Sequence, residues 1–143
     1  YHLGQVLRSK GDFVIIDFEG EPARPLAERR SKQSPLKDVA GMLRSFSYAA
    51  FAALTKYTSR RPEAYAQLES WAQLWETSVS GEFLRAYIEA IGQSPIVPAQ
   101  GEAFETLLDI YMLDKALYEL LYELNNRPTW IRIPLHGIVS LPL

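Results

Sequence analysis

Two polar residues, Gln5 and Asp17, stand at the ends of two short apolar segments near the start of the chain. The segments span 5–8 and 12–18, and the Gly-containing loop between them predicts a β-hairpin. Strand pairing would bring an amide oxygen and a carboxylate close together. Mg²⁺ prefers such oxygen ligands and keeps water or substrate phosphates in its other positions. The spacing indicates a cation site of the kind that phosphoryl transfer uses. A plain strand end followed by a turn is the alternative.

A second group of residues suited to binding lies on a helix expected over about 102–126. At about 100° per residue, one sector of this helix carries leucines and the opposite sector carries tyrosines and a lysine. The leucine sector is expected to face the core; its members are Leu113, Leu117, Leu120 and Leu124. Tyrosine offers a flat ring with a hydroxyl and lysine offers a donor, which together suit a sugar. The residues concerned are Tyr111, Lys115, Tyr118 and Tyr122. Half-burial of the tyrosines under the hairpin is the alternative.

The elements that position these residues are expected to be mostly helical. Ser34 followed by Pro35 predicts a helix start, and apolar residues at helical spacing continue that helix to about Tyr57. Pro62 opens another helix that Gly81 breaks or bends, and a loop over 92–100 follows.

Three further expectations concern burial and irregular structure. Residues 19–33 are expected to form a surface loop, because prolines, glycine and charges interrupt any pattern. The strand over 12–18 is nearly continuous in apolar residues, which predicts burial on both faces. Trp71 and Trp75 share an apolar stripe and are expected in the core rather than at a binding site.

Composition excludes several classes of function. The 143 residues contain 48% hydrophobic residues, enough for a core, and no cysteine, so disulfides and thiolate chemistry are absent. The net charge of -2 gives no general attraction to nucleic acid or to an anionic membrane. No apolar run approaches the roughly 18 residues of a membrane span. We expect a cytoplasmic protein with no nucleic-acid or membrane partner.

Several segments resemble maltokinases, which have an aminoglycoside-phosphotransferase-like kinase fold. Residues 1–7 are similar to the second half of the family's His-Gly-Asp-x-His-Leu-Gly-Gln catalytic loop, and 17–22 to its metal-binding segment. Further similarity covers 25–30, 34–46, 126–130 and 133–135, so it extends over nearly the whole chain. Broader kinases of this fold have Asn where Gln5 stands and Gly where Glu19 stands, which points to this subfamily.

The resemblance implies an α+β fold: the mostly helical C-terminal lobe of a protein-kinase-like protein, with a short N-terminal β-hairpin. The chain would be a single domain over 1–143. Residues 1–20 would form the catalytic-loop and metal-binding hairpin, and 34–143 the helical acceptor-binding part. The parent protein would be a phosphotransferase that makes maltose 1-phosphate from maltose and ATP. Trehalose synthase, fused or separate, would be a partner.

The resemblance also implies roles for single residues. Asp17 would be the principal Mg²⁺ ligand and Gln5 the second. The catalytic base would immediately precede Tyr1, so this chain would contain no catalytic residue and would be inactive alone. Asp38 would brace the catalytic loop by accepting its backbone N–H groups, with stabilisation of the helix start as the alternative. His2 would contact metal-bound water or phosphate, or pack and hydrogen-bond within the loop, the role we favour.

For the acceptor, the resemblance favours disaccharide contact by Lys115, Tyr118, Tyr122 and Tyr111, and it adds Glu19 and Arg127. Two other functions stay open. One is a kinase for another sugar. The other is a non-catalytic helical module that associates with trehalose synthase or with itself.

Overall fold

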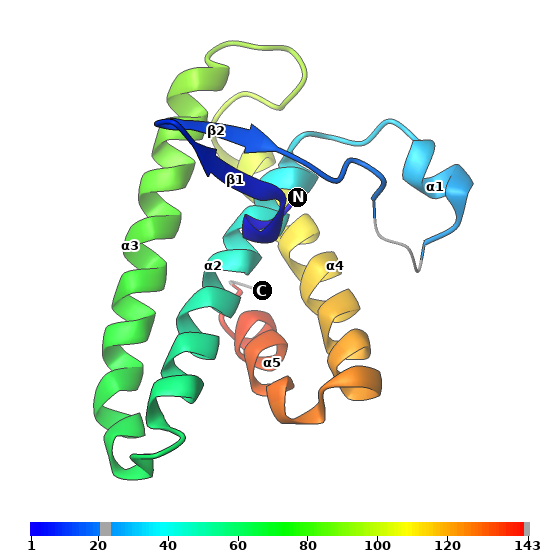
Figure 1. Ribbon diagram of the computed structural model, residues 1–143. Helices are drawn as coiled ribbons and strands as arrows, with labels where there is room; N and C mark the ends of the chain where they lie inside the picture. The colour runs from blue at the N-terminus through cyan, green and yellow to red at the C-terminus, as the bar shows by residue number, and fades with distance from the viewer. Residues whose placement is uncertain (21–23, 142–143) are drawn as a thin grey trace.

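The computed structural model describes residues 1–20 and 24–141, which form one antiparallel hairpin and several helices (Figure 1). The hairpin consists of β1 (Val6–Ser9) and β2 (Asp12–Ile15). The α-helices are α1 (Leu26–Arg30), α2 (Leu36–Thr58), α3 (Tyr65–Ile91), α4 (Glu102–Asn126) and α5 (Arg132–Val139). Short 3₁₀ turns cover Leu3–Gln5 (η1), Pro62–Ala64 (η2) and Pro128–Trp130 (η3). The expected mostly helical α+β class is confirmed. No helix within the described residues is long and apolar enough to cross a membrane.

Helix α2 is central, with α3 on one side and α4 and α5 on the other (Figure 1). It starts where Ser34 and Pro35 predict, and the Ser34 hydroxyl accepts a hydrogen bond of 3.3 Å from the Leu36 backbone N–H. One core cluster surrounds the first half of α2 and includes Phe104 and Leu108 of α4. A second surrounds the last part of α2 and includes Ile133 of α5. The apolar residues of α2 therefore hold three other helices in place.

The hairpin forms as expected, with Val6 opposite Ile15 and Ser9 opposite Asp12. The expected burial of the second strand on both faces is wrong, because every β2 residue is exposed. A two-stranded ribbon has two faces, and this one contacts the helical part mainly at the end where η1 and Val6 lie. There the Leu3 backbone N–H donates to the Ser45 hydroxyl of α2 at 3.2 Å.

Helix α3 runs without a break through Gly81, and the two tryptophans near its start are not in the core. Trp71 is 65% exposed and Trp75 is 46% exposed, so the expectation of core packing is wrong for both. They line a shallow apolar groove with alanines of α2. No residue of α3 is fully buried, because this helix lies on one side of the molecule and packs mainly against α2.

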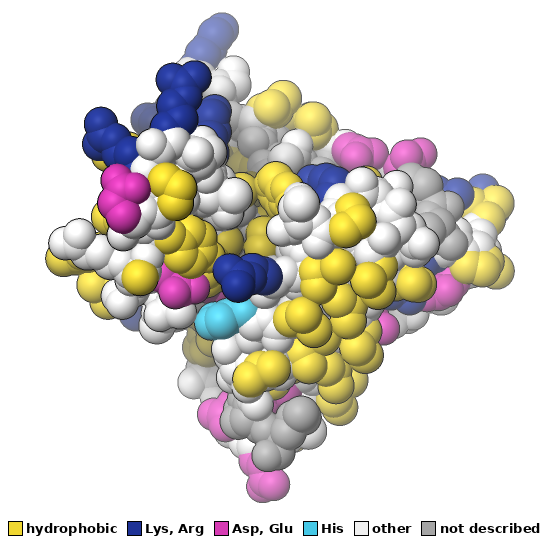
Figure 2. All heavy atoms as spheres, turned by 90° about the horizontal axis from the view of Figure 1, so that it is seen from below, with side chains coloured by type: hydrophobic (Ala, Val, Ile, Leu, Met, Phe, Trp, Pro, Cys, Tyr) yellow, Lys and Arg dark blue, Asp and Glu magenta, His cyan; other side chains and the backbone are white. Residues whose placement is uncertain are grey.

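Helix α4 has the predicted bounds but is rotated about its axis, so that the leucine sector is not its buried face. Leu117 and Leu124 are 51% and 53% exposed and Leu113 and Leu120 are half-buried, so the expected core face is wrong. The buried residues of α4 are Phe104, Leu108, Ala116, Glu119 and Glu123. Apolar side chains are visible over much of the lower end of the molecule, where α2 meets α3 and α4 meets α5 (Figure 2). Two glutamates replace leucines in the interior because α2 and the α4–α5 junction supply arginine partners for them.

Two smaller departures concern the segment after the hairpin. The expected loop over 19–33 contains the short helix α1, whose first turn carries Glu28 and whose last turn carries Arg29 and Arg30, as the helix dipole favours. The motif segment 17–22 is described only as far as Gly20, and Glu21 and Pro22 lie outside the described residues.

Candidate functional site

A cleft of about 620 Å³ lies between the start of the chain, α2 and α4. It brings together most of the site residues predicted from the sequence, although the first and last of them, His2 and Arg127, are more than a hundred positions apart in the chain. Those lining it are His2, Gln5, Asp17, Glu19, Lys115, Tyr118, Tyr122 and Arg127. Tyr111 and Asp38 do not line it. The cleft also receives residues that the sequence did not single out: Tyr48, Glu119, Glu123 and Trp130.

Gln5 and Asp17 are in contact, as the hairpin predicts. The Gln5 amide nitrogen lies 2.7 Å from the Asp17 backbone oxygen and 3.5 Å from its Oδ2 atom. The Gln5 Oε1 atom accepts a hydrogen bond of 3.0 Å from the His2 backbone N–H. The amide therefore bridges the first residues of the chain and the segment that follows the second strand. This contact holds the Gln5 amide next to Asp17, the two residues that the sequence analysis proposes as metal ligands.

Asp17 stands in an unusual backbone conformation, with φ of 62°. Non-glycine residues rarely adopt positive φ, although Asp tolerates it better than most. The conformation turns the chain away from β2 immediately after the strand and leaves the carboxylate exposed at the cleft. Such outliers cluster at functional sites, where the surrounding structure maintains them.

His2 and Asp38 both hold the first residues of the chain. The His2 ring Nδ1 accepts a hydrogen bond of 3.1 Å from the Gly4 backbone N–H, as part of the cap of η1. The Asp38 carboxylate lies 3.6 Å from the backbone nitrogen of Tyr1. Gly41, one turn further along α2, lies directly beneath the Tyr1 carbonyl oxygen, with no room there for a Cβ atom. The loop thus rests on α2 at three points: Asp38, Gly41 and Ser45.

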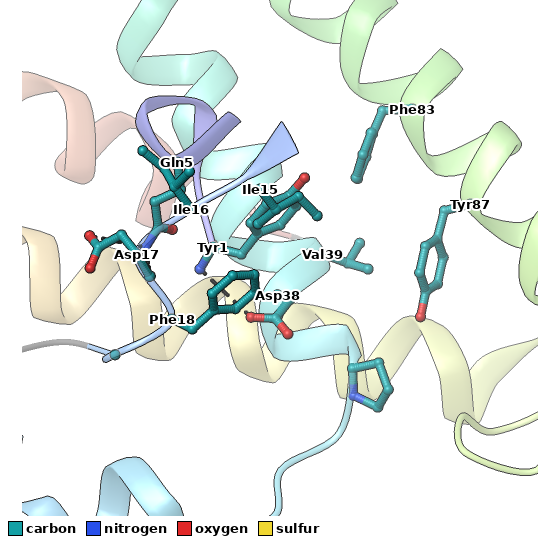
Figure 3. Close-up of a pocket in the computed structure, with 12 residues that line it drawn as sticks. Tyr1, Gln5, Ile15, Ile16, Asp17, Phe18, Asp38, Val39, Phe83 and Tyr87 are labelled. Atoms are coloured by element: carbon teal, nitrogen blue, oxygen red, sulfur yellow. Dashed lines mark hydrogen bonds and ion pairs between the residues drawn. The ribbon is translucent and has the colours of Figure 1, made fainter. Parts of the chain in front are cut away.

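A neighbouring cavity of about 450 Å³ lies on the other side of the same loop. Figure 3 shows Gln5 and Asp17 on its hairpin side, and Phe83 and Tyr87 of α3 on the opposite side. Burial and the nearby Asp38 carboxylate raise the pKa of Tyr87, so its hydroxyl stays protonated. Gln5 and Asp17 therefore separate a largely apolar cavity from the larger cleft on α4.

Two tyrosines of α4, Tyr118 and Tyr122, have cations over their rings. The Lys115 ammonium lies 5.1 Å from the centre of the Tyr118 ring, and the Arg24 guanidinium lies 5.5 Å from it. Arg127 lies 5.4 Å from the ring of Tyr122 and 4.5 Å from that of Trp130. Cation–π contacts of this kind restrain the rings. Tyr118 and Tyr122 thus present ordered aromatic surfaces to the cleft.

Tyr111 lies elsewhere. It packs partly against the core around α2 and lines a smaller cavity of about 320 Å³ beside α1. Lys115 lines both this cavity and the main cleft. The sector of α4 that carries the tyrosines therefore spans two cavities rather than one.

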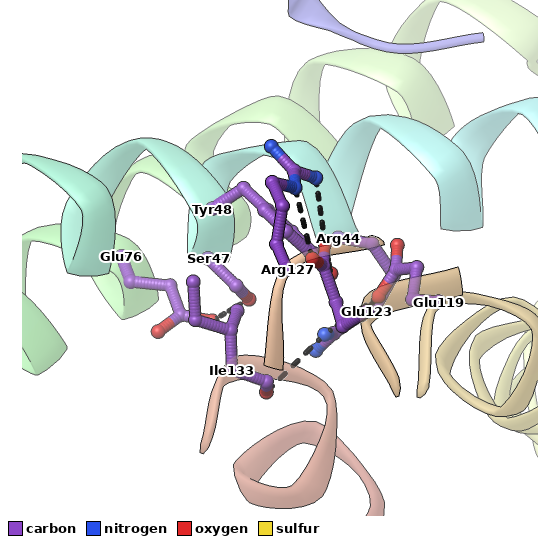
Figure 4. A network of polar contacts seen from close by, with 8 residues as sticks. All are labelled: Arg44, Ser47, Tyr48, Glu76, Glu119, Glu123, Arg127 and Ile133. Carbon is purple, nitrogen blue, oxygen red and sulfur yellow. Dashed lines mark hydrogen bonds and ion pairs between the residues drawn. The ribbon is translucent and has the colours of Figure 1, made fainter. Parts of the chain in front are cut away.

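Two buried carboxylates, each paired with an arginine, form the floor of the cleft (Figure 4). Arg127 donates to both Glu123 carboxylate oxygens, at 2.9 and 2.6 Å, and the Tyr48 hydroxyl donates to Glu123 at 3.0 Å. Arg44 of α2, 2% exposed, pairs with Glu119. Burial and the neighbouring Glu119 carboxylate raise the pKa of Tyr48, so its hydroxyl remains a donor.

The cleft combines hydrogen-bonding groups with an excess of carboxylates. Asp17, Glu19, Glu119 and Glu123 line it against the cations Lys115 and Arg127. Within residues 1–20 and 24–141, no group of three or more His, Cys, Asp or Glu residues could hold a metal ion by itself. A cation bound at Asp17 would therefore take its remaining ligands from a phosphate or from water. Mg²⁺ commonly binds in this way.

Comparison with known proteins points to sugar kinases. No family model matches the chain. A glucosamine kinase of Mycolicibacterium smegmatis (strain ATCC 700084 / mc(2)155) is 35% identical over 138 residues, which cover 93% of this chain and 31% of that protein. A glucosamine kinase of Streptacidiphilus jiangxiensis is 25% identical over 134 residues, 94% of this chain and 28% of that protein. The chain thus spans less than a third of either relative. The names of these relatives support the resemblance to a sugar kinase but not to maltokinases in particular.

Proposed function

We propose that this chain is the acceptor-binding C-terminal part of an ATP-dependent sugar kinase. The observation that carries the proposal is the single cleft in which the Gln5–Asp17 pair meets the tyrosines, lysine and arginine of α4. Both relatives reported above are named glucosamine kinases, which supports the same reading. In this proposal residues 1–20 form the metal-binding hairpin, and residues 34–143 hold the sugar.

The donors at the hairpin fit Mg²⁺. Asp17 would supply a carboxylate oxygen, and Gln5 an amide oxygen after its terminal amide turns over toward Asp17. A bound Mg²⁺ would neutralise charge on the transferred phosphate. The backbone conformation of Asp17 keeps the carboxylate at the mouth of the cleft. The base that accepts the proton of the sugar hydroxyl would immediately precede Tyr1.

An amino sugar is the acceptor that we favour. The surplus of carboxylates in the cleft suits a substrate that carries an ammonium group, and the relatives bear the name of such a sugar. Tyr118 and Tyr122 offer rings against which the apolar face of a sugar packs. Maltose, which the sequence resemblance implies, is the competing acceptor, and an association with trehalose synthase rests on that resemblance alone.

The direct test measures ADP release by the complete kinase with MgATP and, in turn, glucosamine, glucose, maltose and trehalose. We expect glucosamine to give the highest kcat/KM. Faster turnover of maltose would replace the amino sugar with a disaccharide while leaving the kinase proposal intact. A folded, complete protein that phosphorylates no sugar would favour a non-catalytic helical module.

Tyr118→Ala is expected to raise the KM for the sugar by about tenfold, because removal of a stacking ring costs on the order of 1–2 kcal/mol. The KM for ATP should change little. Steady-state kinetics with each substrate varied separately provides the measurement. Tyr57→Ala, at an exposed tyrosine near the end of α2, is the matched control. A raised KM for ATP with an unchanged KM for sugar would place the acceptor elsewhere.

A further inference from the structure

Glu119 is held by one oxygen only. The Arg44 Nε and Nη2 atoms lie 2.9 and 2.8 Å from its Oε2 atom. The Oε1 atom makes no hydrogen bond within the described residues, although the carboxylate lines the cleft. Its neighbour Glu123, one turn further along α4, has both oxygens bonded to Arg127. Of the two buried glutamates on the cleft floor, Glu119 is the one with an oxygen that no hydrogen bond occupies within the described residues, and this oxygen can accept one from a ligand.

Arg44 is locked in the position that this arrangement needs. Its guanidinium is enclosed between α2, α4 and α5, and its Nη2 atom also lies 3.4 Å from the Ile133 carbonyl oxygen. Gly137 of α5 makes room for it, since a Cβ at that position would come within 2.6 Å of the Arg44 Cζ atom. The Arg44 guanidinium therefore contacts three helices, and it does not itself line the cleft.

The charges around Glu119 determine its protonation. Arg44 and Tyr48 face it from α2, and Lys115 and Glu123 lie beside it on α4. Burial raises the pKa of the Glu119 carboxyl, and Arg44 is the strongest influence in the opposite direction. Without Arg44, the carboxyl would retain a proton at higher pH. The buried arginine thus favours an ionised acceptor at the cleft floor.

We propose that the Oε1 atom of Glu119 holds the ammonium group of an amino-sugar acceptor, and that Arg44 is a positioning residue that orients the Glu119 carboxylate through its Oε2 atom. This rests on the proposed sugar-kinase function and adds the group that distinguishes an amino sugar from a neutral one. A carboxylate binds an ammonium more strongly than a neutral hydroxyl, because both partners are charged.

The first test compares glucosamine with glucose as substrates of the complete kinase. Glu119→Gln keeps the size of the side chain and removes its charge. We expect the ratio of kcat/KM for glucosamine to that for glucose to fall by about tenfold or more, through KM. Glu105→Gln, at an exposed glutamate on the same helix, is the control and should leave the ratio unchanged. An unchanged ratio in a folded Glu119→Gln enzyme would overturn the proposal. Failure of the wild-type protein to phosphorylate either sugar would contradict the kinase function instead.

The second test separates positioning by Arg44 from a purely structural role. In Arg44→Gln, Glu119 should take up a proton at higher pH than in the wild type. As the pH is lowered, the KM for glucosamine should therefore begin to rise at a higher pH in Arg44→Gln than in the wild type. Arg44→Lys restores the charge and should restore the profile in part, and it also serves if Arg44→Gln does not fold. Lower thermal stability with an unshifted pH profile in both variants would show that Arg44 acts on the fold alone.

Discussion

Asp17→Asn is expected to lower kcat of the proposed kinase, assayed as the complete protein, by about a thousandfold, which corresponds to roughly 4 kcal/mol of lost transition-state stabilisation. The amide is nearly isosteric with the carboxylate but carries no charge for a divalent cation. Asp17 is exposed, and its backbone rather than its side chain accepts the shorter bond from Gln5. The thermal unfolding temperature should therefore stay within a few degrees of the wild-type value.

Asp12→Asn is the matched control for this substitution. Asp12 lies at the other end of β2, where its carboxylate accepts a hydrogen bond of 2.8 Å from the Phe13 backbone N–H. It lines none of the cavities described above. The Asp12 variant should keep wild-type kcat. Activity of the Asp17 variant within about tenfold of wild type would refute the metal assignment, because a lost metal ligand costs several kcal/mol.

Gly41→Ala is expected to reduce activity by about a hundredfold, since a shift of about 1 Å in a catalytic loop has effects of that size. On an isolated helix the same change would stabilise by roughly 1 kcal/mol, because glycine is a poor helix former. Here a Cβ would meet the Tyr1 carbonyl oxygen, which belongs to backbone and cannot swing aside. The loop that leads to Gln5 must then lift from α2. Single-turnover phosphorylation under saturating substrates provides the measurement.

Gly81→Ala on α3 tests the helix-propensity part of this argument. A Cβ at Gly81 would meet no atom within 4 Å, and α3 is continuous there. This variant should be more stable than wild type by about 0.5–1 kcal/mol and fully active. If Gly41→Ala behaves like Gly81→Ala, contact between the loop and α2 does not control the site.

Local sequence signals located most of the elements. The Ser34–Pro35 start, the loop before α4 and the bounds of α4 follow from capping residues, prolines and spacing, which act over a few positions. The Gln5–Asp17 contact follows from hairpin pairing for the same reason. Gly81 was a weaker signal. A helix can continue through a glycine at modest cost, and α3 does so.

The orientation of α4 could not be read from its own sequence. Leucines normally mark the buried face, but here Glu119 and Glu123 are buried because Arg44 and Arg127 neutralise them. The partner of Glu119 lies 75 positions away on α2. A signal was present in Arg44 itself, a charge placed between Leu43 and Phe46 on the helix that contributes to both core clusters. Such a charge needs a buried partner. The prediction that Trp71 and Trp75 are buried was wrong for a related reason. An apolar stripe on a helix does not show whether another element packs against it.

The hairpin has consequences for how the molecule opens. None of its strand residues is buried, whereas α2 carries both core clusters, so amide hydrogens of the strands should exchange with solvent through small local openings. Gln5 adjoins the first strand and Asp17 follows the second, so both lie on this weakly packed segment. A ligand that joins them would slow exchange across the hairpin while leaving α2 nearly unchanged. Occupancy of the site would then be recorded as a local change in protection, separate from global stability.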